Sequence, residues 1–162
     1  GNRRMAFRLE AIESIAARLA ITDLNTDFCH HLDHGNIESL IALFTDDAHY
    51  SHGSRVTVGI EQIRGLFDRR AAAGVRTARH LYSGLRIELT EKNQATGHSV
   101  CMTFAADQAP PIMSASPYLV ADFIDQYQCG ADGHWRISSR HIERIFMAPS
   151  NQGPVGQVDN SS

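Results

Sequence analysis

The chain has 162 residues, of which 43% are hydrophobic and 20% charged, and its formal net charge is −3 at pH 7. These values are typical of one globular domain with its own core, and they leave neither a basic surplus for nucleic acid nor an apolar run long enough to span a membrane. Three cysteines without CxxC spacing indicate neither a disulfide framework nor a zinc knuckle, so we expect a cytoplasmic protein.

The first part of the chain has the spacing of amphipathic helices. Apolar residues recur every three to four positions over residues 6–32, which predicts one long helix, bent near Thr22, with a buried face. Gly35 suits a left-handed cap at its end, and Asn36 suits the N-cap of a second, short helix that runs through Phe44. A third helix is expected over residues 60–74. The buried face of the first helix would include Ile12, Ile15 and Leu19.

The second part of the chain reads as strands. Four β-rich segments separated by turn signals are expected at residues 80–89, 95–104, 118–127 and 135–146. Helices first and antiparallel strands second favour an α+β fold, in which a curved, mainly antiparallel sheet wraps three N-terminal helices. Residues 1–147 would form this single domain. Residues 148–162, rich in Pro, Gly, Ser, Asn and Gln, would form a flexible tail or a lid.

Two polar residues, His98 and Asp33, can each be explained by a structural role or by a catalytic one. Alternation with a period of two places His98 on the same strand face as Val100, Met102 and Phe104, so we expect its ring to point inward. Such a ring can also be a core histidine bonded to a backbone carbonyl. Asp33 lies in the last turn of a helix, where the macrodipole disfavours a carboxylate by about 0.3–1 kcal/mol. It either helps the chain to turn in solvent, or it orients an imidazole for acid–base chemistry.

Other chemistries lack their sequence signals. His30 and His34 share one helical face and could chelate a metal ion, but the HExxH signature is absent and we expect no native metal. The chain has no GxSxG elbow for a nucleophilic serine and no glycine-rich loop for a nucleotide. Tyr50, after the second helix, and His80, at the start of a strand, are weak signals when each is taken alone. We expect no cofactor.

Together, the motifs resemble the SnoaL-like group of the nuclear transport factor 2-like superfamily. The matching segments are AITDL at 20–24, LDHGN at 32–36, LFTDDA at 43–48, GIEQI at 59–63, RHL at 79–81 and DGHWRI at 132–137. Their order covers about residues 8 to 146 and is more specific than any single segment. The resemblance implies a cone in which one bent sheet surrounds three helices and encloses a deep pocket.

The polar positions resemble those of scytalone dehydratase, a cofactor-free lyase of this superfamily that removes water from a cyclic hydroxyketone. By this resemblance, Asp33 would orient His98, and His80 would shuttle the proton. Tyr50 would polarise a carbonyl through a water. The family's substrate contacts fall on Leu32, Ala121 and Phe123. Because these replace a tyrosine, a serine and an asparagine, we expect a more apolar pocket and a different substrate.

The leading hypothesis is a cofactor-independent dehydratase or isomerase that acts on a cyclic or polyketide-like hydroxyketone, with His98 and Asp33 as the base. The alternatives are a non-catalytic ligand-binding or structural subunit, like the small subunits of ring-hydroxylating dioxygenases, and an isomerase of the ketosteroid type with its carboxylate elsewhere. A structural subunit should fill its cone with side chains, whereas an enzyme should keep an open pocket. The superfamily also implies a homodimer or homotrimer.

Overall fold

In the computed structural model, residues 1–113 and 115–149 are described, and the tail or lid expected over 148–162 lies outside them from residue 150 onward. The helices are α1 (Asn2–His34), α2 (Ile37–Ile41) and α3 (Ile60–Ala72). The strands are β1 (Phe44–His52), β2 (Arg55–Val58), β3 (Thr77–Glu91), β4 (Gln94–Ala106), β5 (Leu119–Cys129) and β6 (Trp135–Met147). The predicted α+β class is confirmed.

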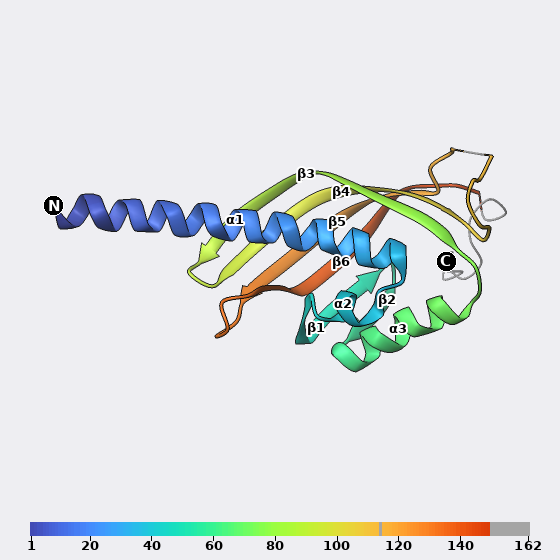
Figure 1. Ribbon diagram of the computed structural model, residues 1–162, viewed down its shortest axis with the longest axis horizontal. Helices are drawn as coiled ribbons and strands as arrows, with labels where there is room; N and C mark the ends of the chain where they lie inside the picture. Colours follow the sequence, from blue (N-terminus) through green and yellow to red (C-terminus); the bar gives the residue numbers. More distant parts are fainter. Residues whose placement is uncertain (114, 150–162) are drawn as a thin grey trace.

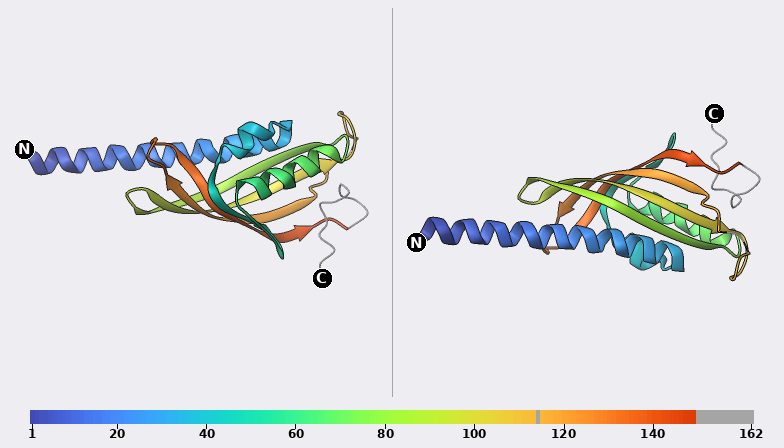
Figure 2. Two further views of the ribbon diagram at one scale, coloured as in Figure 1. Left: turned by 90° about the horizontal axis from the view of Figure 1, so that it is seen from below. Right: turned by 90° about the horizontal axis from the view of Figure 1, so that it is seen from above.

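The strands form one curved sheet of order β2-β1-β6-β5-β4-β3. All neighbours are antiparallel except β1 and β6, which run parallel and make the sheet mixed. The sheet curls around the C-terminal half of α1, and α2 and α3 close one end of the concave side (Figure 1). The two further views show that none of the described helices covers the outer, convex side of the sheet (Figure 2). The sheet and helices therefore form the expected half-cone.

Only the second half of α1 packs against the sheet. Leu24 and Phe28 are buried, and α1 contacts β3 and β6. The N-terminal turns of α1 project past the end of the sheet as a single rod (Figure 1). The prediction that the apolar residues at positions 12, 15 and 19 are buried is therefore wrong. The exposed fractions are 60% for Ile12, 66% for Ile15 and 60% for Leu19.

The corner after α1 forms as expected, but the next element is shorter than predicted. Gly35 has φ 68°, the left-handed conformation in which glycine avoids a steric penalty, and it caps α1. Asn36 occupies the N-cap of α2 without a capping hydrogen bond from its side chain. The short helix ends at Ile41, so that Phe44 opens β1 instead of closing a helix. This early end lets β1 bring Tyr50 back beneath α1.

The core lies between α1 and the concave face of the sheet. Phe28 packs edge-to-face against Phe44 and Phe123, at centroid distances of 6.1 Å each. Tyr127 and Ile137 are fully buried beside them. No helix among the described residues is apolar over the length that a bilayer crossing requires. This aromatic core forms the base on which the site described next is built.

Candidate active site

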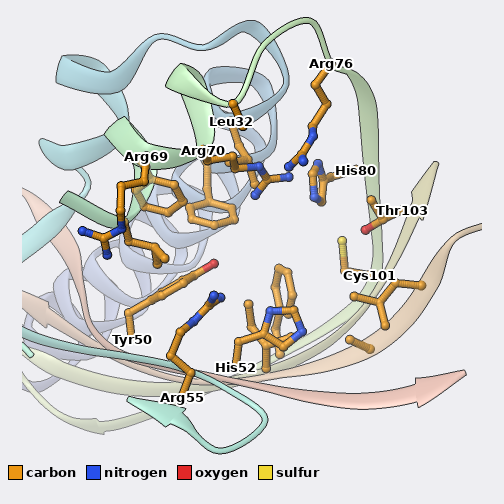
Figure 3. Close-up of a pocket in the computed structure, with 18 residues that line it drawn as sticks. Leu32, Tyr50, His52, Arg55, Arg69, Arg70, Arg76, His80, Cys101 and Thr103 are labelled. Carbon is orange, nitrogen blue, oxygen red and sulfur yellow. The ribbon is translucent and has the colours of Figure 1, made fainter. Parts of the chain in front are cut away.

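A cavity of about 250 Å³ opens on the concave side, between the end of α1, helix α3 and the sheet. Its walls come from every strand and from two of the three helices, so that residues far apart in sequence meet there (Figure 3). Of the expected site residues, five line it: Leu32, Tyr50, His80, Ala121 and Phe123. The cone is therefore not filled by its own side chains.

Asp33 and His80 form a buried hydrogen-bonded pair beside this cavity. The Nδ1 atom of His80 lies 2.5 Å from Oδ1 of Asp33, and the backbone N–H of His80 donates to Oδ2 at 3.0 Å. Their side chains are only 8% and 6% exposed. Because a carboxylate can only accept, Nδ1 carries the hydrogen, and Nε2 is the ring nitrogen that can take a proton from a ligand. The two bonds also explain how a carboxylate is held at the unfavourable end of a helix.

His98 lies on the other side of the sheet, and its expected inward position and its pairing with Asp33 are wrong. Its Nε2 contacts Oδ2 of Asp122 at 3.2 Å, its side chain is 48% exposed, and it does not line the cavity. The buried face of β4 consists instead of small residues, namely Ala95, Gly97, Ser99, Cys101 and Thr103. Close packing beneath the sheet selects this face, since the Tyr127 ring lies where a side chain on Gly97 would be.

Tyr50 reaches the cavity from β1. Its ring packs between Phe44 and Phe67, and its hydroxyl oxygen points into the open space (Figure 3). Burial raises the pKa of Tyr50, while the charges of Arg70 and Arg140 act in the opposite direction. The phenol is therefore neutral near pH 7 and can donate a hydrogen bond to a bound oxygen.

Four arginines also line the cavity, and sequence reasoning missed them: Arg55, Arg69, Arg70 and Arg76. Two of them close α3, where basic residues complement the helix dipole and therefore look structural. The other two lie on the short strand β2 and just before β3. No sequence motif joins these positions. The only signal was the Arg69-Arg70 doublet, which does not by itself distinguish a helix end from a ligand site.

A buried ion pair supports the aromatic wall of the cavity, and the sequence analysis missed it as well. The fully buried guanidinium of Arg140 bonds both oxygens of Asp125, at 2.8 and 2.9 Å, and lies 4.4 Å from the ring centre of Phe28 and 4.5 Å from that of Phe123. Burial alone would lower the pKa of Arg140, but Asp125 holds it above its ordinary value. Tyr127 donates to the same carboxylate at 2.6 Å. This network fixes the rings that line the cavity.

The histidine pair on α1 makes no metal centre with its neighbours. The rings of His30 and His34 stack at 4.3 Å, and Nδ1 of His34 bonds the carbonyl of His30 at 2.8 Å. Within residues 1–113 and 115–149, no three histidine, cysteine or acidic side chains gather closely enough to hold a metal ion.

The fold is a cone of the nuclear transport factor 2-like class, and its cavity has the size of a small molecule. The chain belongs to the SnoaL-like domain family, whose profile matches residues 13–141, and the resemblance inferred from the sequence is confirmed.

Solved structures agree with this family. A candidate scytalone dehydratase from Novosphingobium aromaticivorans has a TM-score of 0.75 at 19% identity, over 92% of this chain and 99% of that one. LinA has a TM-score of 0.72 at 22% identity, over 86% and 92% of the two chains. A protein of unknown function with a cystatin-like fold from Nostoc punctiforme has a TM-score of 0.69 at 23% identity, over 82% and 93%. At these identities the likeness establishes the fold alone. Comparison with curated protein sequences gives no match.

Proposed function

We propose that this protein is a cofactor-independent lyase that removes water from a small cyclic or polyketide-like hydroxyketone, with Asp33 and His80 as its acid–base pair. The observation that carries the proposal is the 2.5 Å contact between these two side chains at the wall of a cavity of about 250 Å³. A buried carboxylate that orients an imidazole is the arrangement that general base catalysis uses. His98, the base expected from the sequence, has no part in it.

In the proposed reaction, Nε2 of His80 takes the proton from the carbon next to the ketone, and the electron pair of that C–H bond moves toward the carbonyl oxygen. Asp33 stabilises the imidazolium that forms. The neutral hydroxyl of Tyr50 donates to the developing enolate oxygen. The enolate then expels the hydroxyl group from the neighbouring carbon as a C=C bond forms, and His80 returns its proton to complete the water. Positioned proton transfer of this kind contributes roughly 10²–10⁴-fold.

The alternative functions differ in what happens to the small molecule once it is bound in the cavity. An isomerase of the ketosteroid type would return the proton to another carbon, and a ligand-binding module would leave the molecule unchanged. The open cavity weighs against a purely structural subunit, which has no use for a buried acid–base pair facing an empty space. The expected homodimer or homotrimer and the cytoplasmic location stay predictions. Sedimentation equilibrium would test the oligomeric state.

The function is tested by incubating the protein in D₂O with cyclic ketones, each with and without a hydroxyl group on the β-carbon. Proton NMR follows deuterium uptake next to the carbonyl, and absorbance follows the new conjugated C=C bond. We expect loss of water from at least one hydroxyketone, and a drop of about 10²–10⁴-fold in the His80→Gln variant. His98→Gln is the matched control and should keep its activity. If wild type and His80→Gln act equally on every ketone, the proposal is wrong.

A further inference from the structure

Three guanidinium groups converge on the same cavity. Arg55 reaches it from β2, Arg70 from the end of α3 and Arg76 from the segment before β3, and their heads turn toward the middle of the space (Figure 3). Arg69 also lines the cavity, but its head points away from the other three (Figure 3). Among the described residues, no aspartate or glutamate lines this cavity.

The positive charges of this cluster lie close enough to act on one another. Burial lowers the pKa of Arg70, and the like charges of Arg76 and Arg55 lower it further. The charges of Tyr50 and Asp33 act in the opposite direction. Two carboxylates lie nearby: Asp33 bonds His80, and Asp107 bonds Nε of Arg76 at 3.3 Å and so compensates part of the cluster's charge. Among the residues that the structure describes, the three guanidinium groups outnumber these two carboxylates. Bringing several cations together out of water is unfavourable unless an anion compensates them.

We propose that the substrate carries a carboxylate, which Arg70 and Arg76 bind while Arg55 attracts it from the rim of the cavity. A guanidinium presents paired N–H donors that match the two oxygens of a carboxylate, and such charge-assisted bonds are about twice as strong as neutral ones. The cavity volume, near the lower end of the roughly 300–1,000 Å³ usual for ligand pockets, fits a small cyclic acid better than a nucleotide.

The same cluster places the carboxylate next to the base. Arg70 and Arg76 line the main cavity together with His80 and a second pocket together with Asp33, so the two cations lie beside the acid–base pair. A carboxylate held there would orient the ring and its acidic C–H toward Nε2 of His80. The catalytic half of this inference rests on the proposed function, but the anion-binding half does not.

Binding of a matched pair of probes tests the anion site without any reaction. Titration calorimetry would compare 2-naphthoate with 2-naphthamide, which has nearly the same shape and no charge. We expect the carboxylate to bind at least tenfold more tightly, and this preference to weaken as salt is raised. Equal binding of the two probes, or binding of neither at millimolar concentration, would overturn the inference.

Two variants and a control assign the preference to the cluster. Arg70→Gln should reduce the preference for 2-naphthoate at least tenfold, and Arg55→Gln, at the exposed rim, should reduce its association rate and salt dependence. Arg64→Gln removes the same charge from the same helix, but Arg64 bonds Glu38 outside the cavity, so its preference should match wild type. If Arg70→Gln does not fold, as judged by circular dichroism, Arg76→Gln, which removes the other binding guanidinium and should also reduce the preference, carries the test. An unchanged preference in every folded cavity variant would refute the site.

Turnover separates this inference from the proposed function. If hydroxyketones with a carboxylate lose water faster than their amides, both stand. If the amides react equally well, the carboxylate inference fails and the lyase stands. If nothing reacts but the preference for 2-naphthoate persists in both wild type and His80→Gln, the anion site stands and the proposed function fails.

Discussion

Among the described residues, two histidine–aspartate pairs lie on opposite faces of the sheet, and they are built very differently. On the concave face, His80 and Asp33 lie 2.5 Å apart, with side chains 8% and 6% exposed. On the convex face, His98 and Asp122 lie 3.2 Å apart, with side chains 48% and 29% exposed. The residue types are the same. The first pair lies beside the cavity on the concave side and has a second hydrogen bond to its carboxylate, whereas His98 borders a more open depression on the outside of the sheet.

The difference shows that environment, and not residue type, makes an acid–base pair useful. Water and salt screen the outer pair, so its mutual attraction is weak. The inner pair is held out of water in one orientation, where electrostatic interactions are stronger and the ring has one defined tautomer. The comparison can be tested by changing matched residues on the two faces.

The largest expected effect is on activity. Asp33→Asn keeps the shape but removes the acceptor that sets the His80 tautomer, and we expect kcat/KM to fall roughly 10²–10⁴-fold. Asp122→Asn makes the same change on the convex face and should leave kcat/KM within about twofold. The assay uses the hydroxyketone identified by the screen. Equal losses in the two variants would remove the functional distinction between the pairs.

The next effect is on stability, and it compares two aspartates three positions apart on β5. Asp125→Asn leaves the Arg140 charge buried without its partner, so we expect the free energy of unfolding to fall by about 3–5 kcal/mol. Asp122→Asn removes half of an exposed pair and should cost less than about 1 kcal/mol. Urea unfolding followed by circular dichroism measures both. A small loss in Asp125→Asn would mean that the buried pair contributes little beyond its packing.

A smaller effect is expected where neighbouring residues of β4 face opposite sides. A Cβ added at Gly97 would lie 2.6 Å from the Tyr127 ring, so Gly97→Ala must push that ring aside and should cost about 1–3 kcal/mol. His98→Ala, one residue further on the convex face, should change the free energy of unfolding by no more than about 0.5 kcal/mol. The same urea experiment reports both. The order of the two variants would reverse if His98 were the inward residue.

The smallest effect concerns an ion pair at the surface, Asp132 with Arg136. Hydrogen bonds from Arg136 and from the His134 backbone hold the pKa of Asp132 well below its usual range. Because the unfolded chain has the higher pKa, about 3.9, this contribution is present above that pH and is lost as the pH falls through the folded-state pKa. Asp132→Asn should therefore flatten the loss of Tm between about pH 4 and pH 2. Added salt should shrink the difference, and a difference insensitive to salt would contradict a screened surface pair.

The sequence by itself determined the architecture, because helix spacing, turn residues and strand propensity are local properties. It predicted three helices and the strands β3 to β6, the Gly35 cap, and a family resemblance that pointed to Tyr50 and His80 beside Asp33. It missed β1, which is rich in polar residues, and β2, which has only four residues. It also assigned Ile12, Ile15 and Leu19 to the core, although all three are exposed.

Tertiary structure alone decided which side chains meet. The alternation of β4 offers two faces, both with apolar residues, and only the Tyr127 ring packed against Gly97 selects the one that points inward. That choice exchanged His98 for His80 as the partner of Asp33. Arg140 and Asp125 lie opposite each other on β6 and β5, and the three converging arginines of the cavity come from β2, the end of α3 and the segment before β3. Their proximity depends on how the sheet curves around α1, which no local sequence pattern records.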